Sequence, residues 1–364
     1  MSIAVEVVSS LADVDRADYQ SLYERSGASF FYDWRFLDAA ERSPLLEVLQ
    51  PYYLLARNQG RLVAFLPSYL QRVAVVDPFG LLAAKAGLSS GDGQTGLFSH
   101  VMHCFDSNLV STMPTGEVVP SMLKAFAALA KKTRARYFGF LNVADGPLIE
   151  QAASQGLRAR HMVDRYYLDL REHRDFEALV RALPADGRRE MNRQLRRFAE
   201  NDTSVSLLAP PFDHRLERLA ELCQQTTARH GTPQYFPAAQ LAAFVRTCGD
   251  LARLCLVERD GVVAGGLICF VDKNFLCIWS AGMRYDQTDF SPYTISFAHV
   301  YRHAFEHGVP VVEAGRLNER IKTRLGLKPL PLYALTRETS AAGQAKHSHA
   351  TAPQERTPHG IAAA

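Results

Sequence analysis

Two stretches of this sequence, YLLARNQGRLVAFLP (residues 53–67) and RLCLVERDGVVAGGL (residues 253–267), share one pattern. In each, two apolar runs flank a short polar turn that ends in glycine, Asn58-Gln59-Gly60 in the first and Arg259-Asp260-Gly261 in the second. Because Asn, Asp and Gly tolerate the positive φ angles of tight turns, each stretch predicts a β-hairpin. A pattern that recurs after about 200 residues predicts two similar α/β domains in one chain.

Helix and strand patterns follow both predicted hairpins in the same order. After the first, apolar residues at i, i+3, i+4 and i+7 predict a helix over 117–132, and the run 137–143 predicts a strand. After the second, residues 274–283 predict a strand, and 292–307 a helix with Ser291 as its N-cap. Residues 309–314 then predict another strand, so the order hairpin, helix, strand occurs twice.

Composition sets mild bounds on function. The 364 residues are 47% hydrophobic, and their formal net charge of +3 does not indicate a polycation that binds nucleic acid or membranes. Six cysteines without a CxxC pair predict buried, reduced thiols. The first residues lack the pattern of a signal peptide, and no run approaches the roughly 18 apolar residues of a membrane span. We therefore expect a cytoplasmic protein without membrane contact.

The same patterns predict where the domains begin and end. Residues 1–170 are expected to form the first domain, 171–212 a basic helical connector, and 213–338 a second domain that holds the active site. The tail 339–364 is rich in Ala, Ser, His, Gln and Thr, a composition typical of disordered segments.

The stretch EAGRLNERIKTRLGLKPLPLY (residues 313–333) resembles part of a known family. In that family an acidic residue and a glycine end a strand, and a lysine, a second glycine, a proline and an aromatic residue follow. The matching residues here are Glu313, Gly315, Lys322, Gly326, Pro329 and Tyr333. With the element order, they make the chain similar, over about residues 20–335, to tandem GNAT-fold proteins, the Fem-type aminoacyl transferases and related bacterial N-acyltransferases. The resemblance implies an α/β (α+β) protein with two GNAT-like domains in tandem, whose mixed, mostly antiparallel sheets are flanked by helices.

Acyl transfer to an amine needs a group that removes the ammonium proton, donors for the carbonyl oxygen, and help for the leaving group. The GNAT resemblance implies that backbone N–H groups of a splayed strand supply the donors. For the acid/base role we expect Glu313, with Asp286 as the second choice. Tyr293 or Tyr285 is expected near the leaving group. The structural alternatives are a solvated loop carboxylate and a buried tyrosine with a satisfied hydroxyl.

Two loops bear on the identity of the donor. CoA-using GNAT proteins hold the pyrophosphate in a glycine-rich loop, whereas residues 284–292 contain no glycine and two aspartates. This composition argues against CoA at that place, and the Fem-type resemblance implies aminoacyl-tRNA instead. Residues 91–96 have the spacing GxGxxG, which by itself favours a flexible loop.

Basic residues offer a second route to an anionic donor such as tRNA or a phosphopantetheine arm. A cluster within 13 positions comprises Arg316, Arg320, Lys322, Arg324 and Lys328. We expect Lys322 to contact the donor or an anionic group of the substrate, and the further binding residues are Arg316, Arg324, Tyr285 and Gly326. The arginines within 188–197 share one helix face, for which a solvated surface is the alternative.

Histidines suggest no metal centre. His299, His303 and His307 lie on one face of a predicted helix, but the glutamate of an HExxH pattern is missing, so we expect a solvated stripe. No bound cofactor or metal is expected.

The leading functional interpretation is an N-acyltransferase. Its donor would be acyl-CoA, an acyl-carrier protein or aminoacyl-tRNA, and its acceptor a small-molecule amine. A tRNA-dependent aminoacyl transferase and a non-catalytic ligand-binding protein are the alternatives. No segment between 170 and 215 is long enough for the coiled-coil pair that Fem-type proteins often insert, which favours a small-molecule or carrier-bound donor. The sequence gives no basis for an oligomeric state.

Overall fold

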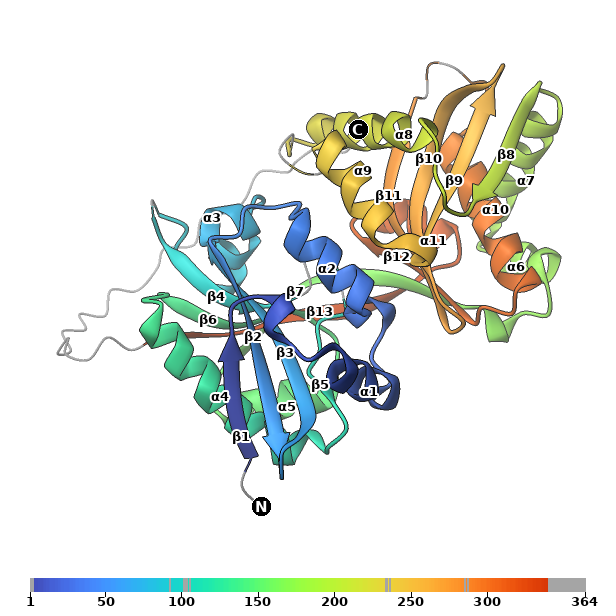
Figure 1. The fold of residues 1–364 in the computed structure, drawn as a ribbon. Helices are drawn as coiled ribbons and strands as arrows, with labels where there is room; N and C mark the ends of the chain where they lie inside the picture. The colour runs from blue at the N-terminus through green and yellow to red at the C-terminus, as the bar shows by residue number, and fades with distance from the viewer. Residues whose placement is uncertain are drawn as a thin grey trace, which may run out of the picture.

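The computed structural model describes residues 3–91, 93–100, 104, 106–232, 235, 237–284, 286 and 288–339. Two halves lie side by side and are joined through strands β7 and β13 (Figure 1). The first half contains β1 (Ile3–Val8), α1 (Arg16–Ser26), α2 (Trp34–Arg42), β2 (Gln50–Asn58), β3 (Arg61–Arg72), α3 (Val73–Val76), β4 (Thr95–Ser99), β5 (Val110–Ser111), α4 (Thr115–Lys132), β6 (Tyr137–Val143), α5 (Gly146–Ser154) and β7 (Arg158–Asp169).

The second half repeats this order. It contains α6 (Phe176–Ala182), α7 (Ala185–Ala199), β8 (Thr203–Leu208), α8 (Arg215–Arg229), α9 (Ala238–Thr247), β9 (Ala252–Arg259), β10 (Val262–Val271), β11 (Phe275–Met283), α10 (Pro292–Glu306), β12 (Val311–Arg316), α11 (Glu319–Arg324) and β13 (Lys328–Glu338). The strand series β1, β2, β3, β4, β6, β7 thus corresponds to β8, β9, β10, β11, β12, β13.

Both predicted hairpins are confirmed. Strands β2 and β3 pair antiparallel up to Asn58 and Arg61, and β9 and β10 pair up to Arg259 and Val262. The turns use positive φ at both central residues, 50° and 81° at Gln59 and Gly60 and 51° and 73° at Asp260 and Gly261. These angles are those of a two-residue turn whose twist matches the flanking strands, which explains why the polar-glycine pairs stand there.

One sheet runs through both halves in the order β1-β2-β3-β4-β6-β13-β7-β12-β11-β10-β9-β8, with β5 beside β3. The last strand of each half crosses to the other, because β7 pairs with β12 while β13 lies between β6 and β7. The pairs β4–β6 and β11–β12 are parallel, and the remaining pairs of described strands are antiparallel. The predicted mixed, mostly antiparallel α/β architecture is therefore confirmed, although as one continuous sheet.

The stretch 171–212, expected to be a connector, contains structure of the second half. Strand β8 pairs with β9 at the edge of the sheet, and α7 packs against α10. The basic composition of residues 171–212 did not reveal this packing, because the arginines of α7 face solvent while Met191 and Gln194 are buried. The domain bounds themselves stay a prediction, and of the predicted disordered tail all but residue 339 lies outside the described residues.

Aromatic side chains join the two halves in one core. Phe36 of α2 packs 5.2 Å from Phe244 of α9 and 5.1 Å from Phe270 of β10, measured between ring centroids. Phe30 stacks on Phe275 at 5.2 Å. Because Phe30, Phe36, Phe244 and Phe270 are buried and Phe275 is partly buried, these contacts form a core that both halves share.

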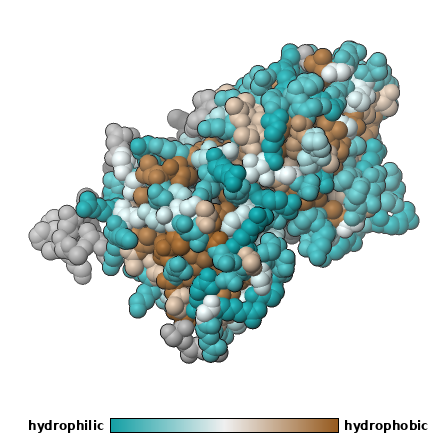
Figure 2. Space-filling model, in the orientation of Figure 1, coloured by the Kyte–Doolittle hydropathy of each residue, from teal (hydrophilic) through white to brown (hydrophobic). Residues whose placement is uncertain are grey.

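The surface is hydrophilic at its rim (Figure 2), and the thiols are buried. Figure 2 shows hydrophilic residues around the rim of both halves, with hydrophobic residues gathered toward their centres. All six cysteines are free and buried, as the sequence predicts. Among the described helices, none combines the length and apolarity that crossing a bilayer would demand.

Candidate functional site

Strands β11 and β12 separate halfway along their length. They pair in parallel at Phe275–Val311, Leu276–Val312 and Cys277–Glu313, and no further pair follows in the described strands. Just beyond the last pair, β11 carries a bulge, because Ile268 of β10 pairs with Ser280 while Cys269 pairs with Ile278. The extra residue is Trp279. Bulges re-aim backbone and side chains beside active sites, and here the bulge lies on the strand that leaves its partner.

A cavity opens where the two strands part. This β11–β12 cavity has a volume of about 360 Å³ and is lined by strand residues Trp279, Ala281, Ala314 and Arg316, by α8, and by Phe79 and Tyr235. Phe79 belongs to the first half, so the cavity lies between the halves. Its size and its mixture of aromatic and polar lining are typical of small-molecule sites.

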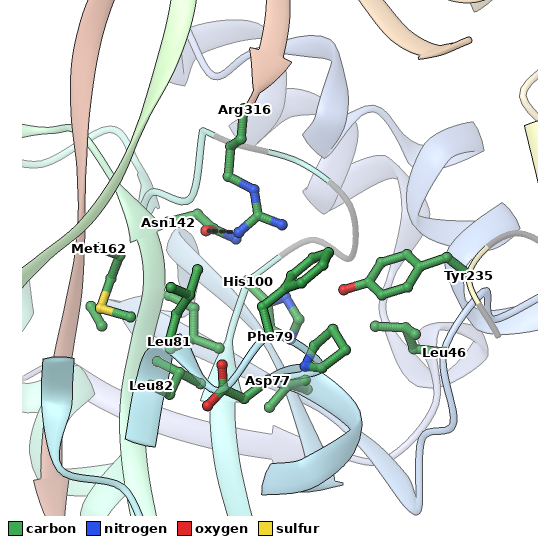
Figure 3. A pocket seen from close by; sticks show the side chains of 14 residues that line it. Leu46, Asp77, Phe79, Leu81, Leu82, His100, Asn142, Met162, Tyr235 and Arg316 are labelled. Carbon is green, nitrogen blue, oxygen red and sulfur yellow. Dashed lines mark hydrogen bonds between the residues drawn. The ribbon is translucent and has the colours of Figure 1, made fainter. Parts of the chain in front are cut away.

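The first half has a corresponding cavity at β4 and β6. These strands also pair in parallel and stop at Ser99–Phe140, after which His100, Leu141 and Asn142 line a small cavity of about 60 Å³. We call it the β4–β6 cavity; Figure 3 shows the side chains around it. Burial lowers the pKa of His100 to about 4, so the imidazole is neutral near pH 7. The two cavities share Phe79, Tyr235 and Arg316.

Glu313 lies in the last β11–β12 pair, immediately before the cavity-lining Ala314, and its side chain is 1% exposed. Its Oε2 is 3.5 Å from Nη1 of Arg165 on β7, which also contacts Asp106 Oδ1 at 3.1 Å. Oε1 has no hydrogen-bond partner among the described residues. Burial raises the pKa of Glu313 to about 7, with Arg165 and Lys322 opposing and Asp106 adding to the shift. A carboxyl with a pKa near neutrality is suited to proton transfer.

Lys322 is buried beside this carboxylate, and burial lowers its pKa to about 7. Its Nζ donates hydrogen bonds to the carbonyl oxygens of Gly315, at 3.1 Å, and Arg316. The ammonium also lies 5.3 Å from the centroid of the Tyr166 ring. Lys322 was expected to contact the donor, but its described contacts hold the end of β12, and it lines neither the β11–β12 nor the β4–β6 cavity.

Tyr293 and Arg324 lie in a third cavity, formed by α7, α11 and the first turn of α10, which we call the α7–α10 cavity. N–H groups at the start of α10 already have acceptors within the protein. Ser291 N–H donates to Gln194 Oε1 at 2.7 Å, and Ser291 Oγ accepts a hydrogen bond from Thr294 N–H. Arg324 is ion-paired with Asp186 at 2.8 Å, and Glu190 also lines the cavity. These carboxylates offset the positive charge that a pyrophosphate would need.

The remaining predicted site residues lie apart from Glu313. Asp286 is largely exposed and forms an ion pair with Arg284 at 3.2 Å, which lowers the pKa of its carboxyl. Gly326 follows α11 with φ of +90°, and a Cβ there would lie 2.8 Å from Leu183, so the position requires glycine for packing. Tyr285 lies outside the described residues. The structure thus brings together Glu313, Lys322 and Arg316, and places Tyr293 and Arg324 in another cavity.

Sequence reasoning missed the partners of Glu313. Arg165 precedes it by 148 residues and Asp106 belongs to a different segment of the first half, so local patterns carry no sign of the contact. His303 and His307 lie on one face, as predicted, with ring centroids 4.0 Å apart, but His299 and His303 are partly buried rather than fully solvated. No group of three or more His, Cys, Asp and Glu side chains in the described part of the chain is arranged to hold a metal ion.

Comparison with known proteins agrees with this architecture. Residues 185–323 match the family described as "Acetyltransferase (GNAT) domain". A search of curated protein sequences finds no match. A tandem GNAT protein from the clavulanic acid biosynthesis pathway is 14% identical, with 93% of this chain and 100% of that chain covered and a TM-score of 0.55.

Two further solved structures share the arrangement over nearly the whole chain. FemX is 10% identical, with 91% of this chain and 97% of that chain covered and a TM-score of 0.62. The C-terminal domain of a putative lysylphosphatidylglycerol synthetase from Agrobacterium fabrum is 13% identical, with coverage of 89% and 93% and a TM-score of 0.55. Residues 185–323 therefore match the GNAT acetyltransferase domain, and the whole chain shares the fold of tandem GNAT proteins.

Proposed function

We propose that this protein transfers an acyl group from an activated thioester or ester donor to an amine of a small acceptor, in the β11–β12 cavity. The observation that carries the proposal is the separation of β11 and β12 after Cys277–Glu313, with the bulge at Trp279 and a cavity between the halves at that point. Parted strands leave backbone N–H groups without a strand partner. Such groups stabilise the oxyanion that forms during acyl transfer.

Glu313 is proposed as the proton acceptor. The amine nitrogen attacks the acyl carbonyl carbon, a C–N bond forms, and the bond from that carbon to the donor sulfur or oxygen breaks. The nitrogen proton passes to Glu313 Oε1, and the departing thiolate or alkoxide takes up a proton from solvent. A carboxyl whose pKa is raised to about 7 matches this task near neutral pH. Because Glu313 lies behind Ala314 rather than in the cavity lining, a water is proposed to carry the proton.

The donor is proposed to be a co-substrate rather than a resident cofactor. The α7–α10 cavity lies at the start of the crossover helix α10, beside Tyr293 and Arg324. Its ion-paired arginine and its glutamate make it a poor cradle for a CoA pyrophosphate. A donor held there would be bound mainly through its uncharged arm.

Aminoacyl transfer from tRNA is the second candidate. It is favoured by the likeness to FemX over 91% of this chain and by exposed arginines along α7. Arg193 is paired with Glu190 at 2.7 Å, and Arg197 donates to the carbonyl oxygen of Asp289 at 2.9 Å, so part of this charge is already engaged. Phosphate contacts would dominate such binding and make it weaken steeply with salt.

A donor panel tests the proposal. Thermal unfolding is followed with acetyl-CoA, longer acyl-CoA esters, free CoA, and charged and uncharged tRNA. A ligand at about 100 times its Kd stabilises the folded state by about 2.7 kcal/mol. Each donor that raises Tm is then incubated with primary amines, and the amide product is sought by mass spectrometry. Amide formation with a CoA ester supports acyl transfer from a thioester, and amide formation with charged tRNA alone supports the second candidate. No amide with any donor contradicts both and favours a non-catalytic binding protein.

A further inference from the structure

Arg316 lies where the two interface cavities meet. It lines the β11–β12 cavity and the β4–β6 cavity, as do Phe79 and Tyr235. Figure 3 shows its side chain reaching from the end of β12 toward Asn142, with His100 nearby and Tyr235 across the cavity. A ligand in the β11–β12 cavity therefore meets the Arg316 guanidinium.

Two neutral side chains lie near this guanidinium. Asn142 Oδ1 lies 3.5 Å from Nη1, and the Tyr235 hydroxyl faces it across the cavity (Figure 3). Burial lowers the pKa of Arg316, and Tyr235 opposes that shift. His100 is neutral near pH 7 because burial lowers its own pKa to about 4. A desolvated guanidinium that lines a cavity is stabilised by an anion, with which it forms short, charge-assisted hydrogen bonds.

The two linings differ in charge, and the β11–β12 lining includes large apolar side chains that are exposed. Among the described residues that line the β11–β12 cavity there is no carboxylate. Asp77 lines the β4–β6 cavity, where its Oδ2 accepts a hydrogen bond from Ala83 N–H at 3.0 Å. Trp279 forms part of the β11–β12 wall, and Phe79 and Leu317 are 45% and 52% exposed in its lining. Large apolar side chains exposed around a cavity typically receive an apolar part of a ligand.

The backbone beside Arg316 supports a role in binding. Leu317 and Asn318, which follow it in the cavity lining, have φ of 63° and 55°. Left-handed conformations at residues other than glycine cost free energy and persist where the surrounding structure holds them. Lys322 donates a hydrogen bond to the Arg316 carbonyl oxygen and so helps to stabilise this backbone conformation.

We infer that the substrate bound between the halves carries a carboxylate or phosphate group beside an apolar portion, and that Arg316 binds this anionic group. The inference deepens the proposed function and rests on it only in taking the β11–β12 cavity as the substrate site. On this inference, the acceptor is an amine that also bears an acidic group.

Tryptophan fluorescence tests this inference without a donor or turnover. The chain has two tryptophans, and Trp279 lines the cavity. In a Trp34→Phe background, Trp279 emission is titrated with three matched pairs: glycine and glycinamide, phenylalanine and phenylalaninamide, and O-phosphoethanolamine and ethanolamine. The anionic member of at least one pair is expected to bind tenfold or more tightly than its neutral partner, at millimolar concentrations or below. A preference in the first two pairs identifies a carboxylate, and a preference in the third a phosphate.

Two variants assign the preference to Arg316. Arg316→Met keeps most of the side-chain volume but removes the charge, and it is expected to abolish the tenfold preference. Arg320→Met, an exposed arginine on α11, removes the same charge away from the cavity and is expected to leave the preference unchanged.

Equal affinity for both members of every pair, no saturable signal with any anion, or a preference that survives Arg316→Met would each overturn the inference. If the preference is found and lost as expected while no donor yields an amide, the anion site stands and the proposed transfer reaction fails.

Discussion

Removing the charge of Glu313 should change how protein stability depends on pH. The carboxyl is 1% exposed, and its pKa is raised from 4.5 to about 7, chiefly by burial. The folded state therefore holds the proton more tightly than the unfolded chain between these values. One pKa unit corresponds to about 1.4 kcal/mol, so the full shift amounts to about 3 kcal/mol. About 2 kcal/mol of it falls between about pH 5 and about pH 7.

The direction of this pH effect follows from the linkage between proton binding and folding. As the pH rises through that window the folded wild-type protein must ionise a buried carboxyl, so it loses stability relative to Glu313→Gln, which has no proton to lose. Glu313 also raises the pKa of Lys322, so any earlier deprotonation of Lys322 in the variant acts in the same direction. The wild-type protein, Glu313→Gln and the exposed control Glu319→Gln are unfolded in urea at several pH values and followed by circular dichroism. A wild-type minus Glu313→Gln difference that is flat from about pH 5 to about pH 7 would refute the reasoning.

Two further variants test the contacts that hold the site and the interface. Arg165→Met leaves Glu313 and Asp106 without their shared cation and should cost about 3–5 kcal/mol near neutral pH. The double variant with Glu313→Gln should regain part of this loss in urea unfolding, and simple additivity of the two changes would contradict the pairing. Phe30→Ala removes a buried ring that stacks on Phe275 of the other half, so it should cost about 3–5 kcal/mol. Calorimetry should show both halves unfolding in one transition in the wild-type protein, and two well-separated transitions would contradict the shared core.

Local sequence patterns account for the elements of this fold but not for their pairing. The hairpin turns could be predicted because the residues with positive φ, Gln59-Gly60 and Asp260-Gly261, are adjacent in the sequence. The exchange of β7 and β13 could not, because each strand pairs with a strand of the other half that is remote in the sequence. The placement of β8 at the sheet edge could not be predicted either, because arginines dominate the composition of residues 171–212.

For the candidate site, sequence reasoning located residues but not their roles. Glu313 and Lys322 stand in the motif that carries the family resemblance, and both are buried at the parting of β11 and β12. The direction of the Lys322 side chain depends on the α11 turn, which brings its Nζ to the backbone carbonyl oxygens of Gly315 and Arg316. Asp286 was the second choice for the same role, but its side chain is exposed.

Blocking the β11–β12 cavity tests the central claim most directly. Ala281→Trp on β11 and Thr226→Trp on the opposite wall both project a large ring into the cavity, whereas Val262→Trp adds the same ring at a position that is 51% exposed. Amide formation from the donor that the panel identifies is measured for each folded variant. The account predicts that either cavity variant loses transfer while Val262→Trp retains it. Transfer at the wild-type rate in both cavity variants would place the chemistry elsewhere and contradict the account.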